Sequence, residues 1–456
     1  MFDLENIQRI YFIGIGGIGM SALARYFHFR GKKVSGYDRT ETTLTRMLIK
    51  EGIEVIFSDE ASLAPKDAEL VVYTPAIPSE HGQLNFYRSN NYELAKRSDV
   101  LGAITRNTFN ICIAGTHGKT TVSTMVAHIL RHTGFGCNAF LGGIAANYNT
   151  NFWSSENNVC VVEADEYDRS FLKLSPDIAV ITAMDADHLD IYGTEKEMQQ
   201  AFVEFSGKLK QNGTLLVKKG LPKQNDLKAT NRLTYAVEQK EADVYATNIR
   251  LMNGFYLFDV IVQDELIEEV ALNMGGMHNV ENASVAISVA KQLGIETEAI
   301  KSAVEDFRGV KRRFEYILKK KHLVYIDDYA HHPAELAALI TSAQSLFPHL
   351  KMIVVFQPHL FTRTRDLADG FARSLDGAEE VVLLPIYPAR EIAIEGVTSE
   401  MIREKMRNPN VDIVSKNELV AFLQNKLTGK DLIITAGAGD IDTLVEPIKN
   451  MLSVSA

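Results

Sequence analysis

The chain has 456 residues, of which 46% are hydrophobic and 23% are charged, and its net charge is −10. This length and composition predict a folded protein of about two to four domains and exclude a disordered one. The negative charge argues against non-specific nucleic-acid binding, which needs a positive surface. No apolar run reaches the roughly 18 residues of a membrane span. We therefore expect neither a nucleic-acid partner nor membrane insertion.

The amino terminus and the cysteines bear on the compartment. The chain begins MFDLEN, without the basic start of a signal peptide. Cys112, Cys137 and Cys160 are an odd number and show no C-x-x-C spacing, which argues against a disulfide framework and a zinc site. We therefore predict a cytoplasmic protein.

A glycine-rich turn dominates the first hundred residues. Residues 8–14 predict a strand, GIGGIG follows at residues 14–19, and residues 20–30 predict a helix. A second strand over residues 33–38 closes on Asp38, whose carboxylate suits a ribose hydroxyl. This is the Rossmann pattern for a ligand that carries a diphosphate. On its own it favours a nicotinamide dinucleotide over a UDP-type ligand, and a glycine-rich turn without a ligand is the other alternative.

The alternation of strands and helices continues through this region. Residues 69–74 predict a third strand, and Pro75 and Pro78 force an extended loop at its carboxyl end. Open α/β sheets bind their ligands at that end. Residues 97–108 are interpreted as a connection, and the first domain boundary is placed near Thr105.

The next strand leads into a variant of the P-loop. Residues 109–114 predict a short apolar strand that breaks at Gly115 and continues into a helix. Ile113 occupies the first glycine position of G-x4-G-K-[ST], so Gly115 must make the turn. Backbone N–H groups of such a loop bind phosphate, Lys119 would reach the outer phosphates, and the Thr120 hydroxyl would bind Mg²⁺. The motif predicts nucleoside triphosphate binding; a chance Gly-Lys-Thr is the alternative.

Two later strands end in acidic residues. Residues 158–166 end in EADE, and residues 177–182 precede the sequence DADH that closes on His188. Strand alternation would put Glu163 and Asp165 on one face. Acidic clusters beside a P-loop supply the hard oxygen ligands that Mg²⁺ needs, with His188 as a further ligand or proton carrier. A solvated charge for Glu163 and an ordinary loop histidine for His188 are the alternatives.

The rest of the middle region carries less chemistry. Residues 242–273 are strand-like and place Gly254 in a hairpin. Residues 275–282 open a helix that runs to about residue 294. Asn279 could cap this helix or contact a base edge, and its spacing alone favours the cap.

The last region repeats the strand–helix alternation. Strands are predicted at residues 322–328, 351–356, 380–385, 410–414 and 431–435, with a helix from Pro333. This order predicts another parallel α/β unit. Its histidines and arginines follow strand ends without metal spacing, which suggests that they bind a carboxylate or a phosphate. For Arg363 and Arg365, a solvated helix start is the alternative.

Taken together, these motifs resemble the Mur ligase family from about residue 7 to residue 450. The resemblance is carried by GIGGIGM (14–20), GTHGKTT (115–121), EADE (163–166), DH (187–188), HN (278–279), DYAHHP (328–333) and FQPHLFTRTR (356–365). The P-loop variant points to the ligase superfamily. The glycine-rich fingerprint with QPH and DYAHHP is similar to the members that add L-alanine.

The resemblance implies an α/β fold of three domains. Residues 1–105 would form a Rossmann-like UDP-sugar-binding domain, and residues 106–313 a central P-loop ATPase domain with a parallel sheet. Residues 314–456 would form a Rossmann-like domain that binds the amino acid and closes over ATP. The implied reaction uses ATP and Mg²⁺ to join L-alanine to the lactyl carboxylate of UDP-N-acetylmuramate through an acyl phosphate. A monomer or a weak homodimer is expected.

The resemblance also implies the roles of individual residues. The catalytic residues would be Lys119, Glu163 and His188, and the metal ligands Thr120, Glu163 and His188. ATP would contact Gly115, Thr116, His117, Gly118, Lys119, Thr120, Thr121, Asn279, Arg313 and Asp328. The UDP-sugar would contact Gly16, Gly17, Ile18, Gly19, Ser35, Asp38 and Thr74. The amino acid would contact Tyr329, His331, His359 and Arg363.

Three positions depart from the pattern of related members. Phe202 stands where several relatives carry a carbamylated lysine, which agrees with the alanine-adding type. Leu360 stands where some alanine-adding enzymes carry arginine, so carboxylate binding would fall more on Arg363. Tyr167 keeps open a recycling ligase that joins UDP-N-acetylmuramate to a tripeptide.

Two alternatives belong to other classes. A nicotinamide-dependent oxidoreductase built on the glycine-rich turn would leave the P-loop unexplained. A P-loop ATPase that acts as a motor or regulator would leave the first domain without a role.

Overall fold

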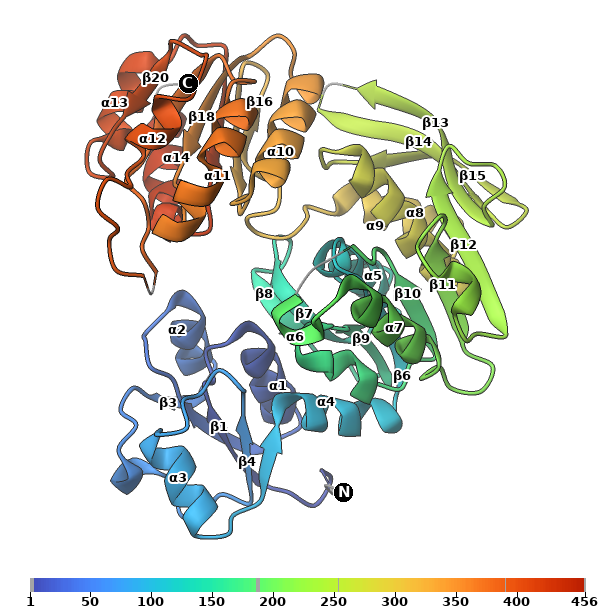
Figure 1. The fold of residues 1–456 in the computed structure, drawn as a ribbon. Coiled ribbons are helices and arrows are strands. Elements are labelled where there is room, and N and C mark those ends of the chain that lie inside the picture. Colours follow the sequence, from blue (N-terminus) through green and yellow to red (C-terminus); the bar gives the residue numbers. More distant parts are fainter. Residues whose placement is uncertain (1–3, 186–188, 253, 390, 455–456) are drawn as a thin grey trace. The chain divides into compact units, whose positions relative to one another are not determined.

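The computed structural model describes residues 4–185, 189–252, 254–389 and 391–454. It is an α/β protein with three sheets (Figure 1). The chain divides into two compact units. The first comprises Met1–Thr247, Asp259–Glu268 and Glu281–Glu305, and the second comprises Asn248–Phe258, Glu269–Val280 and Asp306–Ala456. Within the described ranges, no helix is both long and apolar enough to cross a bilayer.

The first sheet is parallel, in the order β3-β2-β1-β4-β5. Its strands are β1 (Arg9–Ile13), β2 (Lys33–Tyr37), β3 (Glu54–Ile56), β4 (Leu70–Tyr73) and β5 (Leu94–Lys96). Its helices are α1 (Ile18–Phe29), α2 (Thr43–Lys50), α3 (Gly82–Ser89) and α4 (Arg97–Arg106). Alternate residues of β1 bury opposite faces: Phe12 packs with Phe27 of α1, and Tyr11 packs with Tyr87 of α3. The sheet is therefore covered on both faces, as a parallel sheet requires.

The connection predicted over residues 97–108 is wrong, because Arg97–Arg106 is the helix α4. Val100, Leu101 and Ile104 are buried, and their spacing places them on one helical face. Asp99 in the first turn and Arg106 in the last complement the helix dipole. The short length and the polar ends concealed this helix in the sequence.

The second sheet has ten strands in the order β15-β14-β13-β12-β11-β10-β6-β9-β7-β8. The strands are β6 (Phe109–Ala114), β7 (Asn138–Ala145), β8 (Thr150–Trp153), β9 (Val159–Glu163), β10 (Ile178–Ile181), β11 (Thr214–Lys218), β12 (Asn231–Val237), β13 (Val244–Met252), β14 (Phe255–Val262) and β15 (Glu265–Leu272). The helices are α5 (Lys119–His132), α6 (Leu189–Tyr192), α7 (Glu195–Ser206), α8 (Met277–Gln292) and α9 (Thr297–Asp306). Strand β6 lies between β9 and β10 and is parallel to both, so the three carboxyl ends meet at one edge. Strand β8 pairs antiparallel with β7.

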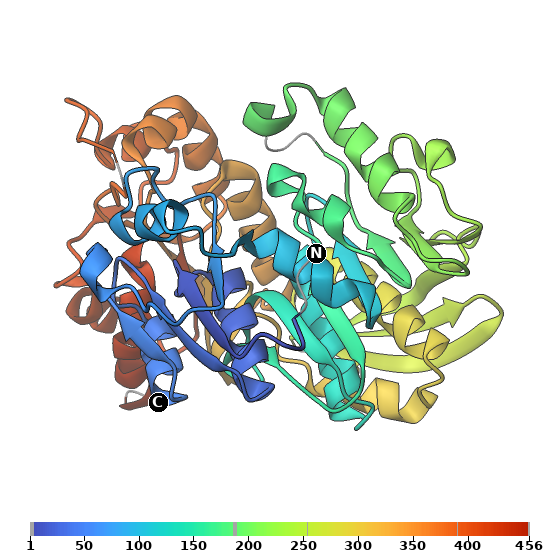
Figure 2. The ribbon, with the colours of Figure 1, turned by 90° about the horizontal axis from the view of Figure 1, so that it is seen from below.

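The first and second sheets share one hydrophobic core within the first unit. Helix α1 packs on β7 and β8, as both ribbon views show (Figures 1 and 2). The ring of Tyr26 lies 5.3 Å from that of Phe140 and 6.2 Å from that of Phe152. Phe12 of β1 and Phe205 of α7 belong to the same buried cluster.

A buried polar network joins the same elements. Asn151 of β8 donates to the carbonyl oxygen of Ile18 at 2.6 Å and to Ser21 Oγ at 3.1 Å, and it accepts from Arg25. Arg25 also pairs with Glu51 at 2.6 Å. Ile18 begins α1 directly after Gly17, so this network ties the glycine-rich turn to the second sheet.

The third sheet has the order β16-β17-β21-β18-β19-β20. The strands are β16 (Glu315–Lys320), β17 (Leu323–Asp328), β18 (Lys351–Phe356), β19 (Glu380–Leu383), β20 (Val411–Ile413) and β21 (Asp431–Ala436). The helices are α10 (Pro333–Leu346), α11 (Phe361–Leu375), α12 (Glu400–Arg403), α13 (Leu419–Lys426) and α14 (Val445–Val454). The predicted strands run parallel, while β16, which the sequence analysis missed, pairs antiparallel with β17. No residue of β16 is fully buried, and its apolar run is only three residues long, Tyr316 to Leu318.

Candidate active site

The loop between β6 and α5 adopts a conformation that only glycine allows at two positions. Gly115 has φ +136° and Gly118 has φ +82°. A Cβ on Gly115 would lie 2.1 Å from Thr182 Oγ1, a distance that no side chain tolerates. The Thr182 hydroxyl donates to the carbonyl oxygens of Ala114, at 3.1 Å, and His117. Gly118 is the N-cap of α5 without a capping side chain, so the first-turn amides suit an anion. The predicted turn at Gly115 is confirmed.

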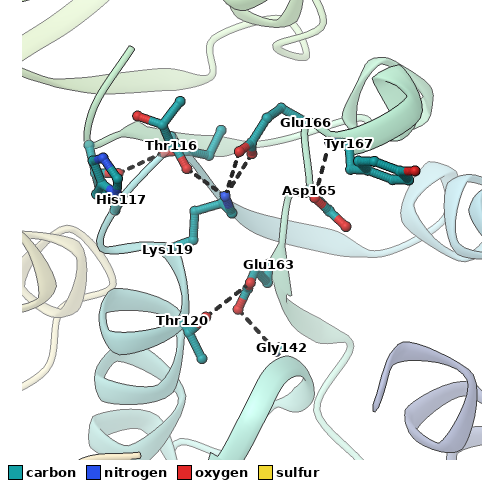
Figure 3. Close-up of polar contacts among 12 residues, drawn as sticks. Thr116, His117, Lys119, Thr120, Gly142, Glu163, Asp165, Glu166 and Tyr167 are labelled. Carbon is teal, nitrogen blue, oxygen red and sulfur yellow. Dashed lines mark hydrogen bonds and ion pairs between the residues drawn. The ribbon is translucent and has the colours of Figure 1, made fainter. Parts of the chain in front are cut away.

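Lys119 is held by an acidic residue for which the sequence analysis assigned no role. Its ammonium lies 2.8 Å from Oε1 and 2.7 Å from Oε2 of Glu166, and it donates to the carbonyl oxygen of Gly115 at 2.7 Å (Figure 3). The Glu166 side chain is fully buried and that of Lys119 is 13% exposed. Burial raises the pKa of Glu166, and the neighbouring Lys119 opposes that rise. The local clue was the acid after the strand end, but its partner is 47 residues away.

Thr120 and Glu163 bring two hard oxygens together at the start of α5. Thr120 Oγ1 donates to Glu163 Oε1 at 3.0 Å, and the N–H of Gly142 donates to Oε2 at 3.0 Å (Figure 3). A Cβ on Gly142 would lie 2.3 Å from the carboxylate oxygens, so glycine is needed for this close approach. A hydroxyl beside a carboxylate is the donor set that Mg²⁺ prefers, so these residues fit the predicted ion.

Asp165 and Asp185 do not join Thr120 and Glu163 in this group of oxygens. Strand β9 ends at Glu163, so strand alternation does not extend to Asp165, and the shared face predicted for the two has no strand to support it. Asp165 lies 3.8 Å from Arg97. Asp185 lies 3.9 Å from the exposed imidazole of His117, and its N–H donates to Thr116 Oγ1 at 3.2 Å. His188, predicted as a metal ligand and catalytic residue, lies outside the described residues, as does Asp187.

Helix α8 carries two asparagines of interest: Asn282, which the sequence analysis did not single out, and Asn279, which it did. In the first unit, Asn282 Oδ1 lies 3.1 Å from the position of a Cβ on Gly118, next to the P-loop. In the second unit, the Asn279 side chain is buried and donates to the carbonyl oxygen of Gly275 at 2.6 Å. This amide donates, whereas an N-cap side chain would accept from a helix N–H. Thr121, also predicted to contact ATP, is buried in the first turn of α5.

The glycine-rich turn is braced by Asp38. The N–H of Gly16 donates to Asp38 Oδ2 at 2.7 Å, and Gly17 is the N-cap of α1. Thr74, at the carboxyl end of β4, lies beside Gly14, since a Cβ there would meet its methyl group at 3.1 Å. Six of the seven predicted UDP-sugar residues therefore lie at one edge of the sheet: Gly16, Gly17, Ile18, Gly19, Asp38 and Thr74. Ser35 differs, because it lies within β2, opposite Tyr11.

Asp328 and Arg313 lie close together in the second unit. Asp328 accepts hydrogen bonds from the N–H of Phe314 at 2.6 Å and of Ala330 at 2.7 Å. Burial raises the pKa of Asp328 to about 6, while these N–H groups and Arg313 act against that rise. The carboxylate thus holds the loops on either side of it. The adjacent Asp327 is buried and pairs with Arg312 at 3.2 Å.

The four predicted amino-acid-binding residues converge in the second unit. His331 Nδ1 lies 3.0 Å from the carbonyl oxygen of Tyr329, and the rings of His331 and His359 are 6.3 Å apart. Arg363 Nη1 lies 3.3 Å from His359 Nδ1. Burial, Arg363 and His331 together lower the pKa of His359. A neutral imidazole beside a guanidinium offers N–H donors to a carboxylate.

The three departures noted in the sequence lie in different surroundings. Phe202 is fully buried, with its ring 5.3 Å from that of Phe171, so it is a core residue of α7. Leu360 is the N-cap of α11 with φ +72°, and its N–H donates to the carbonyl oxygen of Tyr387 at 2.9 Å. Tyr167 is 45% exposed beside Asp165, whose carboxylate accepts from its N–H at 3.1 Å.

Comparison with known proteins covers most of the chain. The family models "Mur ligase family, catalytic domain", "Mur ligase middle domain" and "Mur ligase, glutamate ligase domain" match residues 9–108, 113–290 and 312–439. The chain belongs to the Mur ligase family. The α/β fold predicted for a Mur ligase is confirmed, and these matches support a ligase rather than an oxidoreductase or a motor.

Full-length relatives of this Mur ligase are similar throughout. The UDP-N-acetylmuramate–L-alanine ligase of Flavobacterium johnsoniae is 48% identical over 455 residues, covering 99% of both chains. The protein of that name from Porphyromonas gingivalis is 46% identical, covering 98% of this chain and 99% of the relative. The solved structure of UDP-N-acetylmuramate–alanine ligase MurC from Thermotoga maritima has a TM-score of 0.82 at 28% identity, covering 98% of this chain and 100% of that one. A murein peptide ligase from Psychrobacter arcticus, at 21% identity and a TM-score of 0.65, shows the shared fold alone.

Proposed function

We propose that this chain joins L-alanine to the lactyl carboxylate of UDP-N-acetylmuramate and cleaves ATP to ADP and phosphate. The observation that carries the proposal is the full-length similarity, 48% over 99% of both chains, to a ligase of that name. The P-loop with its lysine, threonine and strand-end carboxylate supports it independently. The product would be a peptidoglycan precursor made in the cytoplasm.

The first chemical step takes place at the P-loop. Lys119 and the first-turn amides of α5 bind the phosphates of ATP, with Gly115, Thr116, His117, Gly118 and Thr121 forming the surrounding loop. Thr120 and Glu163 would hold Mg²⁺, and His188 remains a proposed third ligand. Bound there, Mg²⁺ would neutralise charge on the transferred phosphoryl group. The lactyl carboxylate attacks the γ-phosphorus, ADP leaves, and an acyl phosphate results.

The second step consumes the acyl phosphate. The amine of L-alanine attacks the acyl carbon, loses a proton, and expels inorganic phosphate from a tetrahedral intermediate. Arg363 would pair with the alanine carboxylate, and His359, His331 and Tyr329 follow it in a series of side-chain contacts. Positioning and charge neutralisation supply most of the acceleration.

The two nucleotide substrates meet different edges of the first unit. Gly16, Gly17, Ile18 and Gly19 would take the diphosphate of UDP-N-acetylmuramate, with Asp38, Ser35 and Thr74 nearby. Asn279, Arg313 and Asp328 are also proposed to contact ATP. We also propose domain boundaries after residues 105 and 313, and a monomer or weak homodimer. Light scattering at two protein concentrations tests the last point, and a tight oligomer at both would contradict it.

The deciding experiment is phosphate release from ATP with Mg²⁺ and UDP-N-acetylmuramate. L-alanine, glycine, L-serine and the tripeptide L-Ala-γ-D-Glu-diaminopimelate are compared as acceptors. We expect L-alanine to stimulate release best. Stimulation by the tripeptide alone would assign the recycling reaction, and release without any amine would overturn ligation. Lys119→Ala is expected to abolish turnover while UDP-sugar binding survives.

A further inference from the structure

Arg97, the first residue of α4, lies between the glycine-rich turn and the acidic end of β9. A Cβ placed on Gly19 would be 2.5 Å from Arg97 Nη1 and 3.2 Å from its Cδ. The guanidinium therefore rests against backbone that only glycine leaves bare. On its other side, Nη2 lies 3.8 Å from Asp165 Oδ2. One side chain thus connects the two edges that the proposed reaction uses.

Binding of a diphosphate at the glycine-rich turn needs a positive charge nearby. The residues proposed for the UDP-sugar are glycines, an isoleucine, a serine, a threonine and the anionic Asp38, so none of them is positive. A diphosphate brought to this turn would meet the Asp38 carboxylate without a compensating charge. The Arg97 guanidinium, packed against Gly19, supplies that charge.

The guanidinium also has donors to offer. Its side chain is 25% exposed, and its ion pair with Asp165 at 3.8 Å is too long for a hydrogen bond. Asp165 therefore orients the side chain without consuming its N–H groups. Arg97 lines a small pocket together with Ser98, Glu163, Asp165 and Ser170. Glu163 is the carboxylate proposed to hold Mg²⁺, so Arg97 and the proposed metal site line the same pocket.

We propose that Arg97 binds substrate by donating hydrogen bonds from its guanidinium to the diphosphate of the UDP-sugar. The inference rests on the proposed function, because it takes a nucleoside diphosphate sugar as the ligand. The planar fork of arginine matches two phosphate oxygens, which the ammonium of lysine does not. The shared core and the Asn151 network hold α1 and the second sheet together, so the position of Arg97 between them is set by packing.

The test measures binding of UDP alone by calorimetry, with the full chain and without turnover. Arg97→Gln is expected to weaken UDP binding about ten- to a hundredfold, the range for losing hydrogen bonds to a charged group. Binding of ATP with Mg²⁺ should not change. The matched control is Arg106→Gln, at the exposed last residue of the same helix, and it should leave both affinities unchanged.

Two further variants separate recognition from folding. Arg97→Lys keeps the charge and loses the fork, so an intermediate loss of UDP affinity is expected. Gly19→Ala would push the flexible Arg97 guanidinium away from the turn. The loss of UDP affinity caused by Gly19→Ala should therefore be smaller in the Arg97→Gln background. Additive effects of the two substitutions, or unchanged UDP affinity in Arg97→Gln, would overturn the proposal.

The remaining outcomes are also decisive. If Arg97→Gln binds UDP normally but loses UDP-N-acetylmuramate, the guanidinium serves the acyl carboxylate and the diphosphate assignment is wrong. If the unsubstituted chain binds no UDP at all, the proposed function fails at its first domain. If Arg97→Gln does not bind ATP either, it is misfolded, and the affinity of Arg97→Lys for UDP decides: an affinity equal to that of the unsubstituted chain overturns the proposal.

Discussion

The ion pair between Lys119 and Glu166 predicts that one substitution will tighten ATP binding. Both carboxylate oxygens of Glu166 lie within 2.8 Å of the Lys119 ammonium, and the carboxylate is fully buried. A P-loop lysine must serve the outer phosphates. If Lys119 leaves Glu166 to do so, every binding event breaks this pair. Glu166→Gln should weaken the resting pair and leave the bound state unaffected.

The magnitude follows from the pair's geometry. Glutamine keeps one acceptor oxygen and loses the charge, which removes about 1.5–3 kcal/mol, the net value of a hydrogen bond to a charged group. At about 1.4 kcal/mol per factor of ten, the dissociation constant of ATP should fall about tenfold or more. The free energy of unfolding, measured without ATP, should fall by a similar amount. The substitution should therefore raise the affinity for ATP and lower the stability of the fold.

Calorimetric titration with a non-hydrolysable ATP analogue and Mg²⁺ tests this prediction. Lys119→Ala is the control, because the Glu166→Gln effect on affinity should vanish in its background. Unchanged or weaker ATP binding in Glu166→Gln would refute the reasoning. Lys119 would then keep Glu166 as its partner while it binds phosphate.

Three further predictions concern other contacts. Thr120→Ala should raise the Mg²⁺ concentration for half-maximal activity about tenfold, and Thr120→Ser should restore it; an equal loss in both would contradict a ligand role. Asn151→Ala removes buried hydrogen bonds, including the one to Ile18. It should lower the unfolding free energy by about 2–4 kcal/mol in urea titrations, and it should also weaken UDP binding. Unchanged UDP affinity would show that the glycine-rich turn does not depend on this network. Arg363→Gln removes a positive charge that helps lower the pKa of His359. The pKa of His359 should then rise, so that the imidazole becomes protonated at a higher pH than before. The acid limb of the KM–pH profile for L-alanine should therefore shift to higher pH, and an unshifted limb would refute this assignment.

Local signals in the sequence predicted the central part of the candidate site. Gly115 had to make the turn because Ile113 occupies the usual glycine position, and the structure gives Gly115 a φ of +136°. Glu163 was identified because it ends an apolar strand beside the P-loop, and it contacts Thr120. In both cases the chemistry lies at the end of a predicted strand, where sequence patterns are informative.

Contacts that depend on sheet order could not be predicted in this way. Glu166 meets Lys119, and Gly142 meets Glu163, because β6, β9 and β7 are neighbours, which no local pattern states. Arg97 was overlooked because its helix is short and lacks a capping side chain. The three-domain boundaries remain a prediction, although α4 ends at Arg106, close to the first of them.

The first two sheets share one hydrophobic core, so the distance between the ligand-binding edges of these sheets is fixed. Tyr26, Phe140 and Phe152 interlock across this core, and Asn151 fastens the start of α1 to β8. The span from the glycine-rich turn to the Thr120–Glu163 oxygens is therefore set by packing rather than by a hinge. Under the proposed function, a nucleotide sugar with a shorter or longer acyl arm would bring its carboxylate to a different place along this fixed span. The enzyme would then select substrates by the length of their acyl arm, in addition to any direct contact with that arm.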